Sequence, residues 1–405
     1  MIRLSILVLL FVCLPSPLRA ARDPDEMRDS IQLIRSRGFD AEVHHVTTHD
    51  GYILAIHRIV NPLVNTTGKP VLLQHGLVSS SSQFIINNPA ETLDNPPDNI
   101  LEGPNIGFTL SRLGYDVWLS NIRGNTYSRN HTSLDPQKDT SFWDFTWDDH
   151  ALSDLPAIVD YVQNTTEGRT IAYVGHSQGV LTMLALLSAR REYNNVIKPF
   201  IAMAPVAVLK SMKSPIKYLA LNNFLVEYFK WKGGQFLPSD RYMKRLAEQV
   251  CDSKYMSVCA NTMFLLSGFD GAQLNMTRLG VYFTHLPAGT SAWNIIHYAQ
   301  QYQAKNRIQM FDFGRMGNIR KYGQEEPPEY HFERITNRYI ALMSGMNDWL
   351  VNPVDLIQLR RKLRVPLIMD YVVENPEWNH QDFLFGRDAG KFINARIIEL
   401  LYRYA

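Results

Sequence analysis

The segment "YVGHSQGVL" (173–181) places Ser177 between two glycines in the spacing Gly-x-Ser-x-Gly. A run rich in β-branched and aromatic residues, 170–174, precedes the serine, and an apolar helix-like segment, 180–189, follows it. A serine on such a strand-to-helix turn exposes its hydroxyl, and the turn is so tight that neighbouring side chains must be small. Glycines also occur in ordinary turns, but the two flanking elements favour a nucleophile at Ser177.

A serine hydroxyl is a weak nucleophile and needs a histidine base that a carboxylate orients. Four histidines follow Ser177 in the chain: His285, His297, His331 and His380. Only His380, in "NPEWNHQDF", follows the last predicted strand. Asp348, in "SGMNDWLVNPVD", follows the strand before it, and the interval between the two fits one helix and one strand. Both loops should therefore open on the same edge of a sheet. Asp355 is the alternative acid, but it is expected to cap the helix that it begins.

The tetrahedral intermediate of acyl transfer needs backbone N–H groups that stabilise its oxyanion. Gln178, directly after the serine, supplies one such group. The loop in "VLLQHGLVSS" (71–80) follows an early strand, and Gly76 there permits an unusual backbone that presents the N–H of Leu77. His75 in the same loop is a second candidate base. A structural role is expected for it, because it precedes the serine and its loop serves donor placement.

Short segments rich in β-branched or aromatic residues end in glycine-rich or polar turns, which is typical of buried parallel strands. They are 70–74, 115–120, 170–174, 200–204, 338–343 and 366–373. Helix-like segments, among them 180–189 and 355–363, lie between several of these strands. The alternation predicts an α/β fold with a mostly parallel central sheet that helices cover on both faces.

The alternation stops between about residues 210 and 328, where clear strands are lacking and methionine and aromatic residues are frequent. This interval is interpreted as a helical insertion, a cap or lid over the edge of the sheet near the serine. The predicted core then has two parts, 21–209 and 329–405. The apolar residues of the insertion could also be ordinary core, which is the alternative interpretation.

The first 20 residues, "MIRLSILVLLFVCLPSPLRA", are typical of a secretory signal peptide, with a basic start, an apolar centre and a small residue at its end. No other apolar run approaches the length of a membrane-spanning helix. Removal of 1–20 takes away Arg3 and Arg19, so that 41 basic residues become 39 against 39 acidic ones. This balance argues against a nucleic-acid partner. A secreted or lysosomal location is predicted.

The signal peptide contains one cysteine, Cys13, and the mature chain retains Cys251 and Cys259. Two cysteines in an oxidising compartment predict a disulfide bond. The sequence also carries four N-x-S/T sequons, which predict N-glycosylation: Asn65, Asn130, Asn164 and Asn275.

Two polar clusters are candidate metal sites. The histidines of "HHVTTHD" are His44, His45 and His49, and no cysteine or HExxH motif accompanies them. The acidic residues of "WDFTWDDHALSD" are Asp144, Asp148, Asp149 and Asp154, and they lack the glycine-broken spacing of a calcium loop. A polar surface is expected for the first cluster and a helix start for the second. No P-loop or dinucleotide-type glycine motif is present, so neither a metal nor a cofactor is expected.

Taken together, the motifs resemble those of the acid lipase family, the gastric and lysosomal acid lipases that hydrolyse triacylglycerols and cholesteryl esters. The similarity covers nearly all of the mature chain and includes "DGYILAIHRI" (50–59), "LQHGL" (73–77), "NIRGNTYSRNH" (121–131), "GHSQG" (175–179), "HLPAGTS" (285–291), "GMNDWL" (345–350) and "WNHQDF" (378–383). "GHSQG" followed by "PAGTS" and "NHQDF" in this order is the most specific part.

The resemblance implies an α/β-hydrolase core with a helical cap and lid. It makes Ser177 the nucleophile, Asp348 the orienting acid and His380 the base, with oxyanion donors at Leu77 and Gln178. The chain departs from the family at three positions. Gastric-type members often have a third cysteine where this chain has Ser267, and Trp378 and Gln381 beside "NH" point to a different rim of the acyl site.

The predicted function is a lipase that hydrolyses carboxylic esters of lipids, triacylglycerols, cholesteryl esters or both, at a lipid–water interface. Two alternatives are a carboxylesterase for short soluble esters and a non-catalytic lipid carrier on a hydrolase scaffold. Such carriers typically lose the serine or the histidine, whereas both are present here. The sequence sets no oligomeric state.

Overall fold

The computed structural model describes residues 23–64, 68–238 and 256–405, and every structural statement below concerns these residues. The predicted signal peptide, the sequon at Asn65 and the cysteine Cys251 lie outside them.

A twisted sheet forms the centre of the molecule, with the strand order β1-β2-β4-β3-β6-β7-β10-β11. The strands are β1 (Asp40–Thr47), β2 (Tyr52–Val60), β3 (Pro70–Gln74), β4 (Asp116–Leu119), β5 (Asn130–His131), β6 (Ile171–His176), β7 (Ile197–Met203), β10 (Ile340–Ser344) and β11 (Leu367–Val372). Neighbours from β4 to β11 pair in parallel, whereas β2 is antiparallel to β1, β4 and the short β5. The mostly parallel sheet predicted from the sequence is confirmed.

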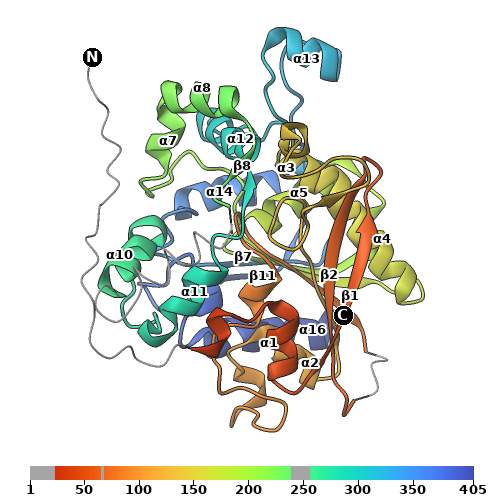
Figure 1. Ribbon diagram of the computed structural model, residues 1–405, viewed down its shortest axis with the longest axis vertical. Helices are drawn as coiled ribbons and strands as arrows, with labels where there is room; N and C mark the ends of the chain where they lie inside the picture. Colours follow the sequence, from red (N-terminus) through yellow and green to blue (C-terminus); the bar gives the residue numbers. More distant parts are fainter. Residues whose placement is uncertain (1–22, 65–67, 239–255) are drawn as a thin grey trace.

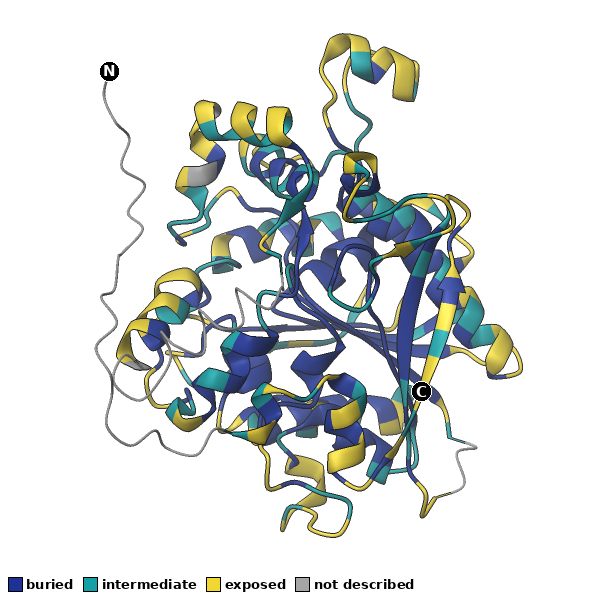
Figure 2. Cartoon of the chain, viewed as in Figure 1, coloured by how far each residue is buried: buried dark blue, intermediate teal, exposed yellow. Residues whose placement is uncertain are grey.

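Both faces of the sheet are buried. Along β3, Leu72 belongs to one hydrophobic cluster, while Val71 and Leu73 belong to the other. This alternation follows from the two-residue period of a strand, and it explains why the parallel strands read as continuous apolar runs. Figure 2 shows the sheet as the buried centre of the molecule.

Helices cover each face. The first cluster packs against α3 (Trp147–Asp149), α4 (Leu155–Thr165), α5 (Gln178–Ala189), α6 (Tyr193–Val196) and α14 (Pro353–Lys362). The second packs against α1 (Ser30–Ser36), α2 (Ile106–Arg112), α15 (Asp382–Phe385) and α16 (Ala395–Tyr404). Short 3₁₀ or π turns occur at Pro24–Glu26, Ser81–Phe84, Ile100–Glu102, Thr140–Trp143, His150–Asp154, Met276–Arg278, Phe332–Arg334 and Gly390–Asn394.

Among the described residues between β7 and β10, helices are the main regular structure. They are α7 (Lys217–Leu221), α8 (Asn223–Lys232), α10 (Met256–Ser267), α11 (Leu279–His285), α12 (Ala292–Gln303) and α13 (Arg315–Tyr322). Two short strands that the sequence did not predict, β8 (Gln235–Phe236) and β9 (Thr290–Ser291), pair with each other. In Figure 1, α7, α8 and α12 group at one end of the molecule, and α13 projects beyond them.

Candidate active site

Ser177 lies on a sharp turn between β6 and α5, with φ +56° and ψ −116°. This conformation is strained for a residue other than glycine and costs about 1–3 kcal/mol. A Cβ atom at Gly175 would lie 3.0 Å from the carbonyl oxygen of Gly179, and one at Gly179 would lie 2.7 Å from the carbonyl oxygen of Gln74. The glycines of the motif therefore allow the backbone segments to approach one another around the serine.

The structure brings the three predicted side chains together. His380 Nε2 lies 2.9 Å from Ser177 Oγ, and His380 Nδ1 lies 2.8 Å from Asp348 Oδ2. Asp348 Oδ1 accepts hydrogen bonds from the N–H groups of Leu350 and Val351 at 2.9 and 2.8 Å. With the Nδ1–H donating to the carboxylate, Nε2 is left to accept the serine proton. All three side chains are buried.

The loops that carry the acid and the base open on one edge of the sheet. Asp348 follows β10 and His380 follows β11, with α14 between these strands, as the spacing predicts. The prediction that Asp355 caps α14 was wrong. The Asn352 side chain caps α14 by accepting from Val354 N–H, whereas Asp355 Oδ2 accepts from Ser211 N–H.

The other histidines after Ser177 lie away from it. His285 Nε2 is 2.9 Å from the carbonyl oxygen of Asp25, and His297 Nε2 is 3.0 Å from that of Gln309. His331 pairs with Glu333 at the surface.

The loop after β3 carries Leu77, one of the two predicted oxyanion donors. The other, Gln178, begins α5, where a helix leaves its first N–H groups without helical partners. Within the described residues, neither N–H donates to another protein group. A Cβ at Gly76 would lie 3.1 Å from Ser177 Cβ, so a glycine lets this loop approach the serine closely.

His75 holds the same loop in place. Its Nδ1 donates to the carbonyl oxygen of Gly76 at 2.8 Å, and its Nε2 accepts from Ile122 N–H and Asn125 Nδ2 at 3.3 and 3.1 Å. Burial lowers the pKa of His75 to about 4, so the ring stays neutral in this arrangement. These contacts agree with a structural role for His75.

His176, directly before Ser177, supports the base His380, a role that was not predicted from the sequence. Its Nε2–H donates to the carbonyl oxygen of His380 at 3.1 Å, and the two ring centroids are 4.9 Å apart. Burial, together with the nearby His380, holds the pKa of His176 well below its ordinary value. The contact joins positions 204 residues apart in the chain, so local spacing carries no signal for it.

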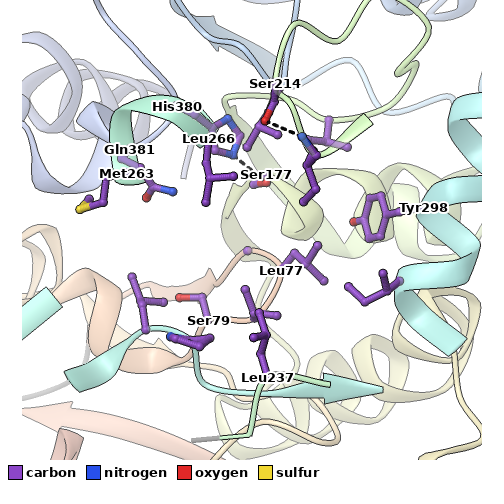
Figure 3. Close-up of a pocket in the computed structure, with 18 of the residues that line it drawn as sticks. Leu77, Ser79, Ser177, Ser214, Leu237, Met263, Leu266, Tyr298, His380 and Gln381 are labelled. Carbon is purple, nitrogen blue, oxygen red and sulfur yellow. Dashed lines mark hydrogen bonds between the residues drawn. The ribbon is translucent and has the colours of Figure 1, made fainter. Parts of the chain in front are cut away.

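A cavity of about 620 Å³ opens beside the serine (Figure 3). Leu77, Ser177, His380 and Gln381 line it from the core. Most other lining side chains are apolar and come from the interval between β7 and β10, among them Ile216, Val226, Phe229, Val258, Met263, Leu266, Phe283, Leu286, Ile295 and Ile296. Trp378, predicted with Gln381 at the rim, is instead fully buried in the second hydrophobic cluster.

The remaining predicted residues lie as follows. Cys259 is disulfide-bonded, and because Cys251 lies outside the described residues, the pairing stays a prediction. Asn130 and Asn164 are exposed, whereas Asn275 is partly buried and its side chain accepts from Thr277 N–H.

The acidic cluster divides among several roles. Thr146 and Asp149 form a capping box at the start of α3, which confirms a helix start there. Asp154 instead pairs with Arg123, and Asp148 accepts from Phe311 N–H and the Tyr330 hydroxyl. The described chain contains no group of three or more side chains placed to hold a metal ion. None of its helices has the length and apolar character needed to cross a membrane.

Two histidines of the 44–49 cluster, His44 on β1 and His49 just after it, form side-chain hydrogen bonds. His44 Nδ1 lies 2.9 Å from the Tyr161 hydroxyl, and its Nε2 lies 2.9 Å from Glu42 Oε2. His49 Nδ1 lies 3.1 Å from Ser153 Oγ.

Comparison with known proteins shows the family. Residues 30–88 match a family model described as a partial α/β-hydrolase lipase region, and residues 69–386 match the model for the α/β-hydrolase fold. Lipase lipl-1 of Caenorhabditis elegans is 38% identical over 394 residues, which cover 94% of this chain and 92% of the relative. The lysosomal acid lipase/cholesteryl ester hydrolase of Homo sapiens is 35% identical over 392 residues, 95% of this chain and 93% of the relative.

A solved structure shows the same fold at low sequence identity. A candidate lipase from Sulfolobus solfataricus superposes with a TM-score of 0.58 at 14% identity, over 90% of this chain and 94% of that one. The parallel sheet, the serine on its strand-to-helix turn and these matches agree with one another. The chain belongs to the α/β-hydrolase-fold lipases.

Proposed function

We propose that the protein is a serine hydrolase that cleaves carboxylic esters of lipids through an acyl-enzyme on Ser177. The observation that carries the proposal is the hydrogen-bonded series from Ser177 to His380 to Asp348 at the wall of a large apolar cavity. A nucleophile, a base and an orienting acid in this order are the parts that acyl transfer requires.

In the proposed mechanism, His380 Nε2 takes the proton of Ser177 Oγ as the oxygen attacks the ester carbonyl. The carbonyl oxygen becomes an oxyanion, which the N–H groups of Leu77 and Gln178 stabilise. His380 then gives the proton to the leaving alcohol, and the acyl group stays on Ser177. A water molecule, deprotonated by His380, attacks the acyl-enzyme; His380 returns this proton to Ser177 Oγ as the bond to the acyl group breaks, which releases the fatty acid and restores the serine. Asp348 keeps the proton of the imidazole on Nδ1 throughout.

The cavity supports a substrate with a long apolar group. Its volume of about 620 Å³ lies within the range of small-molecule sites, and its lining is mostly apolar. A polar ester placed at the serine would leave its acyl chain against the apolar side chains of the helices above. Acyl esters of glycerol or of a sterol fit this description.

The outer surface of α8 supports a lipid–water interface as the working environment. Phe224, Tyr228 and Trp231 share one face of the helix, and Phe224 and Trp231 are 72% and 82% exposed. Val226 and Phe229, on other faces, line the cavity. Figure 2 shows the outer side of α7 and α8 as exposed. Apolar side chains on both sides of a surface helix indicate that the outer side meets an apolar partner.

A place in the secretory pathway or the lysosome completes the proposal. The signal peptide predicted at 1–20 supports it, and so does the name of the human relative, a lysosomal acid lipase/cholesteryl ester hydrolase.

The test of the proposed function is Ser177→Ala, expressed in a secreting host. Hydrolysis of emulsified long-chain esters should fall by at least about 10⁴-fold, because the residual rate comes from binding and oxyanion stabilisation alone. A fluorophosphonate probe should label the unaltered protein and not the variant. Near-normal turnover by the variant would overturn the proposal. A higher rate on short dispersed esters than on emulsified long-chain esters would replace the lipase with a carboxylesterase.

A further inference from the structure

The side chain of Gln178 makes a set of buried contacts that acyl transfer itself does not use. Its Oε1 accepts from Asn294 Nδ2 at 3.1 Å and from the Tyr298 hydroxyl at 3.0 Å. Its Nε2 lies 3.2 Å from His150 Nδ1. Gln178 is 1% exposed and Asn294 and His150 are fully buried, so the hydrogen bonds to Asn294 and His150 are shielded from water, whereas the bond to Tyr298 is partly buried.

The hydrogen bonds define one orientation of the Gln178 amide. The Tyr298 hydroxyl and Asn294 Nδ2 both donate to the same atom of the Gln178 side chain, which is its oxygen. The nitrogen then donates to His150 Nδ1, which requires His150 to be neutral with its proton on Nε2. Burial, followed by the positive charge of Arg123, holds the pKa of His150 well below its ordinary value, in agreement with this state.

The contacts join the serine turn to the wall of the cavity. Asn294 and Tyr298 stand one turn apart on α12, and Figure 3 shows Tyr298 reaching from that helix toward the space beside Ser177. Asn294 also donates to Thr290 Oγ1 in β9 at 3.0 Å. A single residue thus carries a predicted oxyanion N–H on its backbone and fastens α12 with its side chain.

We propose that the Gln178 side chain is a positioning residue: by binding Asn294, Tyr298 and His150 it aims its own backbone N–H at the oxyanion and keeps α12 fixed to the core. The inference rests on the proposed function. It also distinguishes α12 from the other helices over the active site. α12 stays with the nucleophile during turnover, and any opening toward lipid involves other parts of the cap.

The first variant is Gln178→Met, which keeps the volume and removes all three hydrogen bonds. We expect kcat per active site to fall by about 10- to 100-fold with KM within about twofold, because a displaced donor weakens stabilisation of the transition state and not of the bound ester. Titration with a fluorophosphonate counts the folded sites, so loss of folded protein does not enter the value.

The second variant is Gln178→Glu, whose neutral acid can accept from Asn294 and Tyr298 and donate to His150 Nδ1. Its kcat should approach that of the unaltered protein near pH 5 and fall toward that of Gln178→Met as the buried carboxyl ionises. His75 and His297, which act electrostatically on His150 together with Arg123, have pKa values of about 4 and 3, so they stay neutral across pH 5–8. A ratio to the unaltered protein that does not change with pH would contradict the proposal.

The inhibition constant of a transition-state analogue would not change if Gln178 had a purely structural role. Ser177 Oγ adds to the carbonyl carbon of an alkyl trifluoromethyl ketone, its proton passes to His380, and the ketone oxygen becomes an oxyanion on the two N–H groups. In Gln178→Met the inhibition constant of this ketone should rise in proportion to the loss of kcat/KM, whereas that of the fatty-acid product should change less than twofold. Equal changes for both compounds would overturn the proposal.

Tyr298→Phe and Tyr193→Phe form a matched pair. Tyr298→Phe removes one hydrogen bond to Gln178 and should lower kcat per site, but by much less when combined with Gln178→Met, because the bond is then already absent. Tyr193 is buried, and its hydroxyl donates to Asp160 at 2.9 Å, away from the cavity. Tyr193→Phe should lower thermal stability and leave kcat per site unchanged.

The outcomes distinguish failure of the proposed function from failure of the role assigned to the Gln178 side chain. Activity in Ser177→Ala would remove the proposed function whatever Gln178 does. An inactive Ser177→Ala together with full kcat per site in Gln178→Met would remove only the role of the Gln178 side chain.

Discussion

Asp348, the acid of the triad, both anchors its own loop and keeps the His380 proton on Nδ1. Asp348 Oδ1 accepts from the N–H groups of Leu350 and Val351, and Oδ2 faces His380 Nδ1. The first oxygen anchors the carboxylate to its own loop, and the second selects the imidazole tautomer. These separate roles of the two oxygens predict that Asp348→Asn and the nearby Asp355→Asn have different effects.

Asp348→Asn should preserve the conformation of the loop but lose the His380 tautomer that has its proton on Nδ1. The amide oxygen can still accept from the Leu350 and Val351 N–H groups, which leaves the NH₂ group facing His380 Nδ1. The imidazole proton then moves to Nε2, where it blocks acceptance of the Ser177 proton. We expect kcat to fall by about 10⁴-fold, measured on a soluble ester. The melting temperature should change little.

Asp355→Asn is the control for this experiment. Asp355 lies in the first turn of α14, where its Oδ2 accepts from Ser211 N–H, and it has no contact with His380. Its substitution should leave kcat unchanged. If Asp355→Asn abolished activity while Asp348→Asn retained it, the acid of the site would be Asp355.

The triad could be predicted from the sequence because each of its residues lies in the turn or loop that follows a strand, and strand ends are visible as the ends of apolar runs. The contacts of His176 and of the Gln178 side chain could not, because their partners come from distant segments that only the folded chain places there. The capping error at Asp355 has a local cause. Asn352, directly before the proline that begins α14, is the better cap, since a proline is well suited to the first helical position.

At the scale of elements, the strands of the parallel part of the sheet were predictable, whereas the antiparallel β1 and β2 were not. The predicted segment 70–74 coincides with β3, and the other parallel strands differ from their predictions by at most three residues at either end. β1 is largely exposed along its length at the edge of the sheet, so it lacks an apolar run. α8 carries apolar side chains toward both the cavity and the outside, which hides the periodicity that marks an ordinary surface helix.

The outer face of α8 allows a test of the proposed lipid contact. Replacing Phe224 and Trp231 by serine should lower the rate on emulsified long-chain esters by about tenfold or more, because each buried aromatic side chain contributes roughly 1.5–3 kcal/mol to an apolar contact. The rate on a soluble short ester should stay within about twofold, since neither side chain lines the cavity.

Tyr402→Ser is the matched control for this surface. Tyr402 is 87% exposed on α16, at the opposite end of the molecule from α8 in Figure 1. Its loss should change neither rate. Equal effects of the α8 and α16 substitutions on emulsified esters would show that the two surfaces do not differ in their contact with lipid.

At the scale of the whole molecule, buried acids and buried histidines oppose each other in their response to pH. Burial raises the pKa of Asp148 to about 7 and that of Asp154 to about 6, so the folded protein binds more protons there than the unfolded chain. Burial lowers the pKa of His57 to about 4 and that of His297 to about 3, with the opposite effect. The acids therefore favour the fold as pH falls, and the histidines favour it as pH rises.

Asp148→Asn isolates one side of this balance. The stability contributed by the raised pKa of Asp148 is fully present below the ordinary value of 3.8, declines as pH rises, and is lost above about 7. Asparagine does not titrate, so its stability relative to the unaltered protein should increase between pH 5 and pH 8, by roughly 2–4 °C in melting temperature. Thermal unfolding of both proteins at each pH measures this difference directly. A difference that stays constant across the range would mean that the carboxyl of Asp148, although it accepts from Phe311 N–H and the Tyr330 hydroxyl, ionises near its ordinary pKa in the folded protein.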